Sequence, residues 1–128
     1  MKSIPLLFLF LCFSLTACGQ SNSTRIILGK EHAANELKTS LTEKGLHNVV
    51  DNKSNIIKDS LTAVKVAEPI LFDIYGEDNI IKQRPYETYL INNYWVIRGT
   101  LPKESKGGTF MIIINARNAA VLRITHGK

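Results

Sequence analysis

No cysteine follows position 18 in this chain of 128 residues. The two cysteines that it contains, Cys12 and Cys18, lie close together near the N-terminus. This placement excludes a disulfide framework in the rest of the chain, and it excludes a zinc cluster built on cysteines there. The folded part must therefore be held together by packing and by hydrogen bonds.

Runs of basic residues and motifs of nucleophilic catalysis are also missing. The formal net charge is +5, but the lysines and arginines are spread along the chain, so a nucleic-acid-binding stripe is not expected. Neither G-x-S-x-G nor S-x-x-K occurs, and the glycine-containing segment 99–108 lacks the features of a phosphate-binding loop. The mild excess of positive charge agrees with an acidic partner.

Histidines and carboxylates give little support for a metal site or an enzyme. The three histidines, His32, His47 and His126, are scattered and form no H-E-x-x-H motif, so neither a metal nor a cofactor is expected. His126 is interpreted as a surface or strand-end histidine.

One enzymatic alternative stays open at this point. Asp73 or Glu87 could serve as an acid with a raised pKa in an apolar pocket, with Tyr86 and Tyr89 as oxyanion donors. Alternating tyrosine and glutamate on a strand are more typical of its half-exposed face, however. We therefore expect a protein without catalytic residues.

The longest apolar run lies at the N-terminus. After Lys2, the residues from Ile4 to Leu15 are apolar except for Ser14. A helix of this length spans about 18 Å at ~1.5 Å per residue, which is short of the ~30 Å of a bilayer core. The run is therefore typical of a signal peptide rather than of a transmembrane helix.

The end of this run resembles the lipobox of bacterial lipoproteins, because "LTAC" ends in Cys18. The resemblance implies that the Cys18 sulfur carries a diacylglycerol and that Cys18 becomes the first residue after cleavage. Gly19 follows where an Asp would retain the protein in the inner membrane, so the outer membrane, facing the periplasm, is expected. The alternative is an unmodified secreted protein cut after Gly19. The predicted organisation is a lipoprotein signal peptide (1–17), a lipidated cysteine with its tether (18–30) and a single α+β domain (31–128).

The domain is predicted to consist of helices followed by an antiparallel sheet. One helix is expected over Glu31–Lys44, and a second begins after Asp59 or Ser60, has Pro69 inside it and ends at Gly76. A short turn or helix is expected over 77–84, and strands are expected over 86–91, 94–101, 109–115 and 121–125, with a tight turn at Asn92 and Asn93.

Two apolar features predict the core of the sheet. The continuous apolar run from Met111 to Ile114 predicts a central strand that is covered on both faces. Trp95, the single tryptophan, is interpreted as a core residue, with an interface anchor as the alternative.

From Lys65 onward the chain resembles the bacterial family of nuclear transport factor 2 fold immunity proteins, which belong to polymorphic toxin systems. The segments that carry the resemblance are "AEPILFDIYGEDNI", "KQRPYETYLINNYWVIRGTLP", "KGGTF" and "IIINARNAAVLRITHGK". The sequence departs from the family pattern at Asn115, where Asp is usual, and at Ala119, where Gly is usual. Ala119 should strain or lengthen the loop that it occupies.

The resemblance implies a cone of N-terminal helices packed on a curved, mainly antiparallel sheet, and a protein that binds and neutralises a toxin without catalysis. A lipid-anchored inhibitor in the periplasm implies a toxin that acts on the cell wall, the membrane or the envelope. The second half also looks similar to a PepSY-type domain, so a small envelope-binding or inhibitory module is the alternative. The interface residues predicted for the partner are Arg84, Tyr94, Lys103, Glu104 and Lys106.

Overall fold

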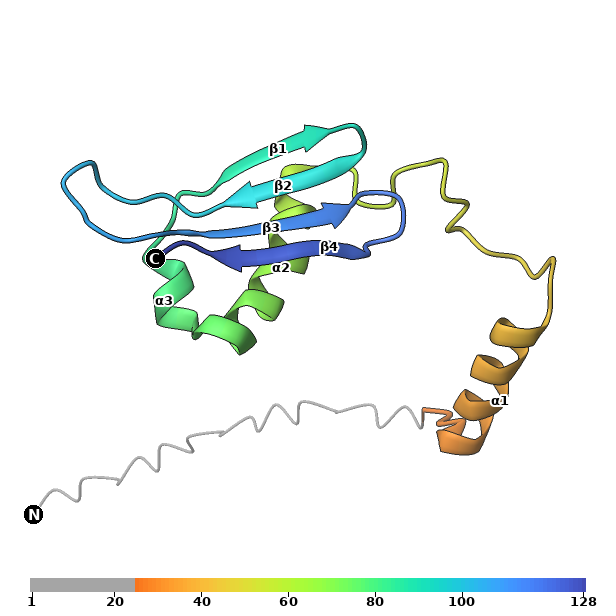
Figure 1. Cartoon of the computed structure of the whole chain (residues 1–128). Coiled ribbons are helices and arrows are strands. Elements are labelled where there is room, and N and C mark those ends of the chain that lie inside the picture. Colours follow the sequence, from red (N-terminus) through yellow and green to blue (C-terminus); the bar gives the residue numbers. More distant parts are fainter. Residues whose placement is uncertain (1–24) are drawn as a thin grey trace, which may run out of the picture. The chain divides into compact units, whose positions relative to one another are not determined.

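A computed structural model describes residues 25–128 of the chain (Figure 1). The predicted signal peptide, Cys18 and the beginning of the tether lie outside the described residues. The chain divides into two compact units, which end and begin at Gly45 and Leu46, and each unit is described by itself.

The described part of the first unit is dominated by one helix. Helix α1 (Gly29–Thr42) begins and ends two residues earlier than the predicted helix Glu31–Lys44. None of its residues is buried, and the side chains of Leu37 and Leu41 are 61% and 77% exposed. No helix among residues 25–128 has the length and hydropathy needed to cross a membrane.

The second unit begins with a loop and then forms the predicted second helix. Helix α2 (Ser60–Tyr75) is capped by Asp59, whose Oδ1 accepts a hydrogen bond of 2.8 Å from the Thr62 N–H. The helix ends at Gly76, which has a φ of 86°, and the short helix α3 (Glu77–Ile81) follows at once. Both boundaries of α2 agree with the prediction.

Helix α2 buries one face against the sheet. Ala63, Ala67 and Leu71 are buried, whereas Leu61 is 63% exposed. The small side chains of the two alanines bring the helix close to the sheet, and Leu61 then lies beyond the edge of the contact.

Four strands form one antiparallel sheet in the order β1-β2-β3-β4, as predicted. They are β1 (Glu87–Ile91), β2 (Tyr94–Arg98), β3 (Phe110–Asn115) and β4 (Val121–His126). Helix α2 contacts β1, β2 and β3 and lies behind the sheet in Figure 1. The predicted α+β class, with helices on a curved antiparallel sheet, is confirmed.

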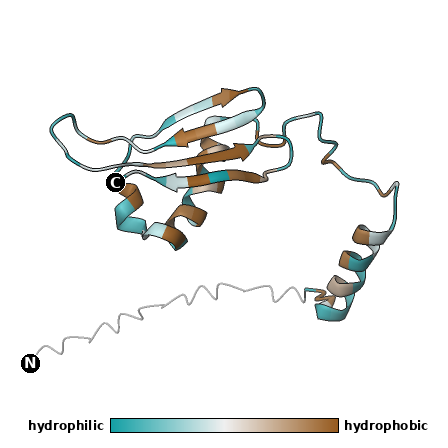
Figure 2. Cartoon of the chain, viewed as in Figure 1, coloured by the Kyte–Doolittle hydropathy of each residue, from teal (hydrophilic) through white to brown (hydrophobic). Residues whose placement is uncertain are grey.

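The sheet has one buried face, and this face forms the core with the helices. Figure 2 shows hydrophobic residues concentrated on the strands and on α2. The buried apolar residues are Trp95, Ile97, Phe110, Ile112 and Ile114 on the strands, Ala63, Ala67, Leu71 and Ile80 on the helices, and Ile57 and Ala116 in the loops. Trp95 is 6% exposed and its Nε1–H donates a hydrogen bond of 2.9 Å to the Ile57 carbonyl, so its predicted core position is confirmed.

The prediction that β3 is covered on both faces is wrong. Burial alternates along the strand, so that Phe110, Ile112 and Ile114 are buried while Met111 and Ile113 are only half-buried. The helices of this unit cover one face of the sheet. The side chains that alternate with the buried ones point to the other face, where only neighbouring side chains shield them.

Gln83, the only buried polar residue of the described chain, joins α3 to the sheet. Its side-chain Nε2 donates to the Asn79 carbonyl (2.9 Å), and its Oε1 accepts from the Phe110 N–H (2.9 Å). These two partners fix the orientation of the amide, so the second Nε2–H points to the His126 Nε2 at 3.2 Å. A Cβ at Gly99 would collide with this amide, which explains the glycine at the end of β2.

We expect Gln83→Met to lower the free energy of unfolding by about 2–4 kcal/mol, because the Phe110 N–H and the Asn79 carbonyl each lose a buried partner. Urea denaturation followed by circular dichroism measures the effect. Glu104→Met, in an exposed loop, is the control and should change stability by less than about 0.5 kcal/mol. Equal effects of the two substitutions would contradict the role assigned to Gln83.

Both hairpin turns at one end of the sheet use left-handed backbone conformations. Asn92 and Asn93 have φ values of 48° and 64°, as expected for the predicted two-residue turn. Ala119 has a φ of 61° in the turn between β3 and β4. The strain predicted at this alanine therefore has a structural basis, because a Cβ disfavours this region.

Ala119→Gly should raise the free energy of unfolding by roughly 0.5 kcal/mol, because relief of the left-handed strain exceeds the entropy that glycine adds to the unfolded chain. The matched control is Ala120→Gly, at the next position, which has no positive φ and should lower stability by about 0.5 kcal/mol. Thermal or urea unfolding of both variants decides the sign. A loss at both positions would refute the strain at Ala119.

Candidate partner-binding site

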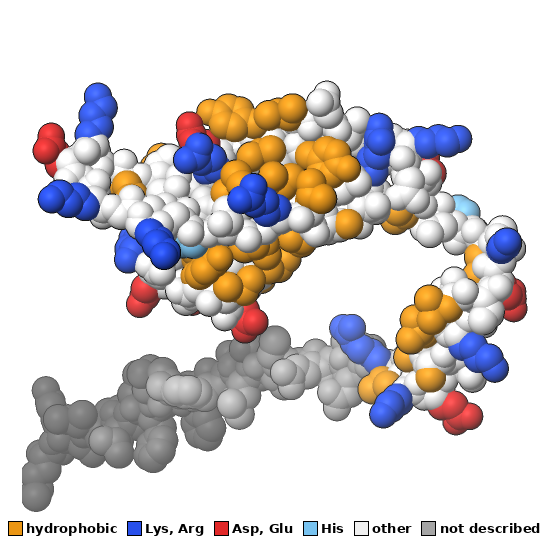
Figure 3. Space-filling view, viewed as in Figure 1, with side chains coloured by type: hydrophobic (Ala, Val, Ile, Leu, Met, Phe, Trp, Pro, Cys, Tyr) orange, Lys and Arg blue, Asp and Glu red, His pale blue; other side chains and the backbone are white. Residues whose placement is uncertain are grey.

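The sheet has a face that α2 does not cover, and we call it the open face. The antiparallel register places its side chains in three rows across the strands. The rows are Glu87, Arg98, Met111 and Thr125; then Tyr89, Val96, Ile113 and Arg123; then Ile91, Tyr94 and Asn115. Figure 3 shows hydrophobic side chains gathered over the sheet, with lysine or arginine side chains among them.

Most of the open face is apolar or aromatic. Tyr89 and Ile91 on β1 are 51% and 54% exposed, and Val96 and Ile113 beside them are half-buried. The row through Val96 is therefore a continuous apolar surface that ends at Arg123.

The arginines of the open face form no ion pair within the described chain. Arg98 and Arg123 are exposed, and no carboxylate among residues 25–128 lies within 4.0 Å of either one. The one carboxylate of this face, Glu87, instead accepts a hydrogen bond of 3.2 Å from the Tyr89 hydroxyl. The face therefore presents two arginines that are free to pair with acidic groups.

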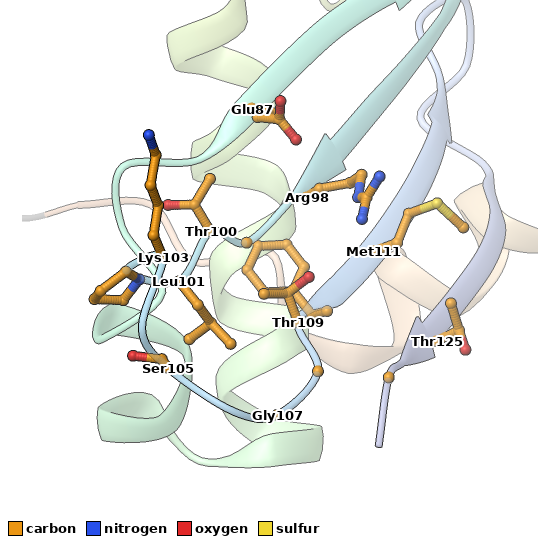
Figure 4. Close-up of a pocket in the computed structure, with 15 residues that line it drawn as sticks. Glu87, Arg98, Thr100, Leu101, Lys103, Ser105, Gly107, Thr109, Met111 and Thr125 are labelled. Carbon is orange, nitrogen blue, oxygen red and sulfur yellow. The ribbon is translucent and has the colours of Figure 1, made fainter.

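A hollow of about 710 Å³ lies where the loop between β2 and β3 borders the open face. Figure 4 shows that its wall on the sheet is the row of Glu87, Arg98, Met111 and Thr125. The opposite wall is the loop, which contributes Leu101, Lys103, Ser105 and Thr109. Its two cations outnumber its single carboxylate, so the hollow favours an anionic group.

A second cluster lies on the helix side and is already internally paired. Arg84 and the Tyr86 hydroxyl both donate to one carboxylate oxygen of Glu68, at 2.9 Å from the Arg84 Nε and 2.8 Å from the Tyr86 oxygen. Together with Leu61, Val64 and Pro85, these residues line a largely apolar groove of about 600 Å³. Burial and the hydrogen bond to Glu68 raise the pKa of Tyr86 to about 12.

The structure does not bring the five predicted interface residues together. Lys103, Glu104 and Lys106 lie in the loop between β2 and β3, and Lys103 lines the hollow. Tyr94 is on the open face, at the opposite end of β2 from that loop. Arg84 lies in the helix-side groove and is paired with Glu68. Their role in an interface stays a prediction.

The residues of the enzymatic alternative do not form the site that it requires. Asp73 and Glu87 are both exposed, so neither lies in a closed apolar pocket. The hydroxyls of Tyr86 and Tyr89 donate to Glu68 and Glu87, so both are already engaged within the chain.

The histidines are also separate from one another. His126 ends β4, where it is half-buried, bonds to Gln83 and packs against the Tyr75 ring with 5.1 Å between centroids. Among residues 25–128, no group of three histidine, cysteine, aspartate or glutamate side chains could hold a metal.

Sequence reasoning missed the residues that give the open face its character, namely Val96, Ile113 and Arg123. Val96 and Ile113 each follow a buried residue, Trp95 and Ile112, so strict alternation along a strand assigns them to the opposite face. This alternation can be read from the sequence. Arg123 could not be placed in the same way, because a bulge between β3 and β4 shifts the register at Ile113 and Ile114.

Comparison with known proteins identifies a family and two relatives. A model of the NTF2 fold immunity protein family matches residues 62–128, which include all four strands and most of α2. Two proteins of Escherichia coli (strain K12) are also similar: uncharacterized protein YhhH, 32% identical over 75 residues, and uncharacterized protein YbbC, 36% identical over 75 residues. Each alignment covers 58% of this chain, but only 59% of YhhH and 62% of YbbC. No solved structure shows a significant match.

The raised pKa of Tyr86 in the helix-side cluster predicts that stability falls at high pH. Because the pKa of Tyr86 is raised to about 12 from an ordinary value of 10.0, its contribution to stability is present below pH 10 and is lost as the pH rises through 12. We expect an absorbance titration of tyrosinate to show a transition near pH 12 that Tyr86→Phe removes. Tyr94→Phe is the control and should leave this transition in place, and a transition that survives Tyr86→Phe would contradict the assignment.

Proposed function

Because the chain belongs to the NTF2 fold immunity protein family, we propose that it binds a protein toxin and neutralises it by covering the toxin's functional surface, without catalysis. The family match carries this proposal, since it extends over the complete sheet. The exposed positions of Asp73 and Glu87 support a role in binding, because neither provides the buried acid that an enzyme of the alternative kind needs.

We further propose that the protein is anchored in the bacterial envelope through Cys18, on the outer membrane and facing the periplasm. The support is the apolar run that ends in "LTAC" and the Gly19 that follows it. Several acyl chains hold a protein durably at a membrane, whereas one acyl chain alone is marginal. An inhibitor held there meets toxins that act on the cell wall, the membrane or other envelope components.

The proposal is tested by co-expression with a candidate toxin that is directed to the periplasm. The full chain should restore growth, and a chain without residues 1–17 should fail to do so because it stays in the cytoplasm. Growth equal to that of cells without the protein would contradict the proposed function. Mass spectrometry of the native protein tests the anchor separately, and a bare Cys18 thiol would refute it.

A further inference from the structure

We propose that the open face is the surface on which the toxin docks, and that the docking region of the toxin is an apolar surface carrying carboxylates. This inference rests on the proposed function and names the surface and the partner chemistry that the function leaves open. Its centre is the row of Tyr89, Val96 and Ile113, and its polar contacts are Arg98 and Arg123.

The composition of the open face is that of an interface core. Interface cores are enriched in tyrosine, methionine and arginine and depleted in lysine, glutamate and aspartate, and this face carries Tyr89, Tyr94 and Met111 with two arginines, one glutamate and no lysine. Tyr89 and Ile91 still have about half of their surface exposed. A partner that covers them therefore gains from the burial of apolar area.

The positive charges of Arg98 and Arg123 favour a partner with carboxylates. Arg98 and Arg123 stand on β2 and β4, on either side of the central strand β3, so a partner lying across Met111 and Ile113 can reach both guanidinium groups. Neither has a carboxylate within 4.0 Å in the described chain, and Glu87 is engaged by Tyr89. Arginine pairs with carboxylates through two parallel hydrogen bonds, which adds both affinity and orientation.

A second copy of this chain fits the same surface poorly. Two open faces placed against each other would bring four arginines together against two glutamates, in an interface with a net positive charge. Like charges in an interface cost free energy, whereas an acidic surface on a different protein removes this cost.

The cluster on the helix side of the unit offers such a partner fewer free hydrogen-bonding groups. Arg84 donates two hydrogen bonds to Glu68, and Tyr86 donates to the same carboxylate oxygen, so this cluster is satisfied without a partner. The hollow beside the open face, in contrast, adds Lys103 to the row that contains Arg98. Arg98, Arg123 and Lys103 therefore form a group of cations without an ion pair in the described chain, on the open face and at its border with the loop.

The experiment compares two charge reversals that change the net charge equally. In the first variant Arg98→Glu and Arg123→Glu alter the open face, and in the second Lys65→Glu and Lys82→Glu alter exposed positions on α2 and directly after α3. Binding to the purified candidate toxin is measured by calorimetry, with the full chain and with each variant. The affinity should fall about 100-fold or more for the first variant and less than about threefold for the second.

A second pair of variants distinguishes a loss of toxin binding from a folding defect of the charge-reversal variants. Ile91→Asp changes a residue of the open face that is 54% exposed, and Ile74→Asp changes a residue of α2 that is 51% exposed. Ile91→Asp should weaken toxin binding and abolish protection of growth, while Ile74→Asp should retain both. Circular dichroism and the urea midpoint confirm that each variant is folded.

The outcomes separate this inference from the proposed function. If the full chain neutralises the toxin and open-face variants bind as well as helix-side variants, the docking surface is wrong and the function stands. If the full chain binds no toxin and does not protect growth, both proposals fall. Self-association of the full chain that the open-face reversals abolish in the absence of toxin would assign this face to a second copy and would also overturn the inference.

Discussion

The arrangement of the second unit depends on a single buried amide. Gln83 connects the carbonyl of Asn79 in α3, the N–H of Phe110 at the start of β3 and the ring of His126 at the end of β4, while its backbone carbonyl accepts a hydrogen bond from Thr100 after β2. Both N–H groups of the Gln83 side chain and one lone pair of its oxygen form hydrogen bonds. These bonds restrict α3 to a single position against this end of the sheet. A buried amide with these partners tolerates little displacement, because each lost hydrogen bond would leave a polar group without water.

The position of α3 that Gln83 fixes determines which face of the sheet is left without a helix. With α3 fixed at the sheet by Gln83, and α2 continuous with it through Gly76, both helices pack against the side that carries Trp95 and Ile112. The opposite side receives no helix of this unit, and the antiparallel register then assembles apolar side chains and two arginines into rows there. The surface proposed for the toxin is thus a consequence of how the core is built, since the same alternation that buries one set of residues exposes the other.

Local patterns predicted most of the fold, and long-range contacts account for what they missed. The Asp59 cap, the glycine after α2, the Asn92–Asn93 turn and the four-stranded order follow from residues that are neighbours in the sequence. The partners of Gln83 are 27 and 43 residues away at Phe110 and His126, and Glu68 is 16 residues from Arg84, so no local pattern indicates these contacts. For the same reason the continuous apolar run of β3 does not reveal that only its alternate residues are buried.

The central claim is that the toxin covers the open face, and chemical protection of single cysteines tests it most directly. Because no cysteine follows position 18, Ile91→Cys on the open face and Ile74→Cys on α2 can each be placed in a chain in which Cys12 and Cys18 are both replaced by serine, and labelled with a maleimide. The account predicts that saturating toxin slows the labelling of position 91 and leaves the labelling of position 74 unchanged. Unchanged labelling at position 91 with bound toxin, or protection of position 74 instead, would contradict it.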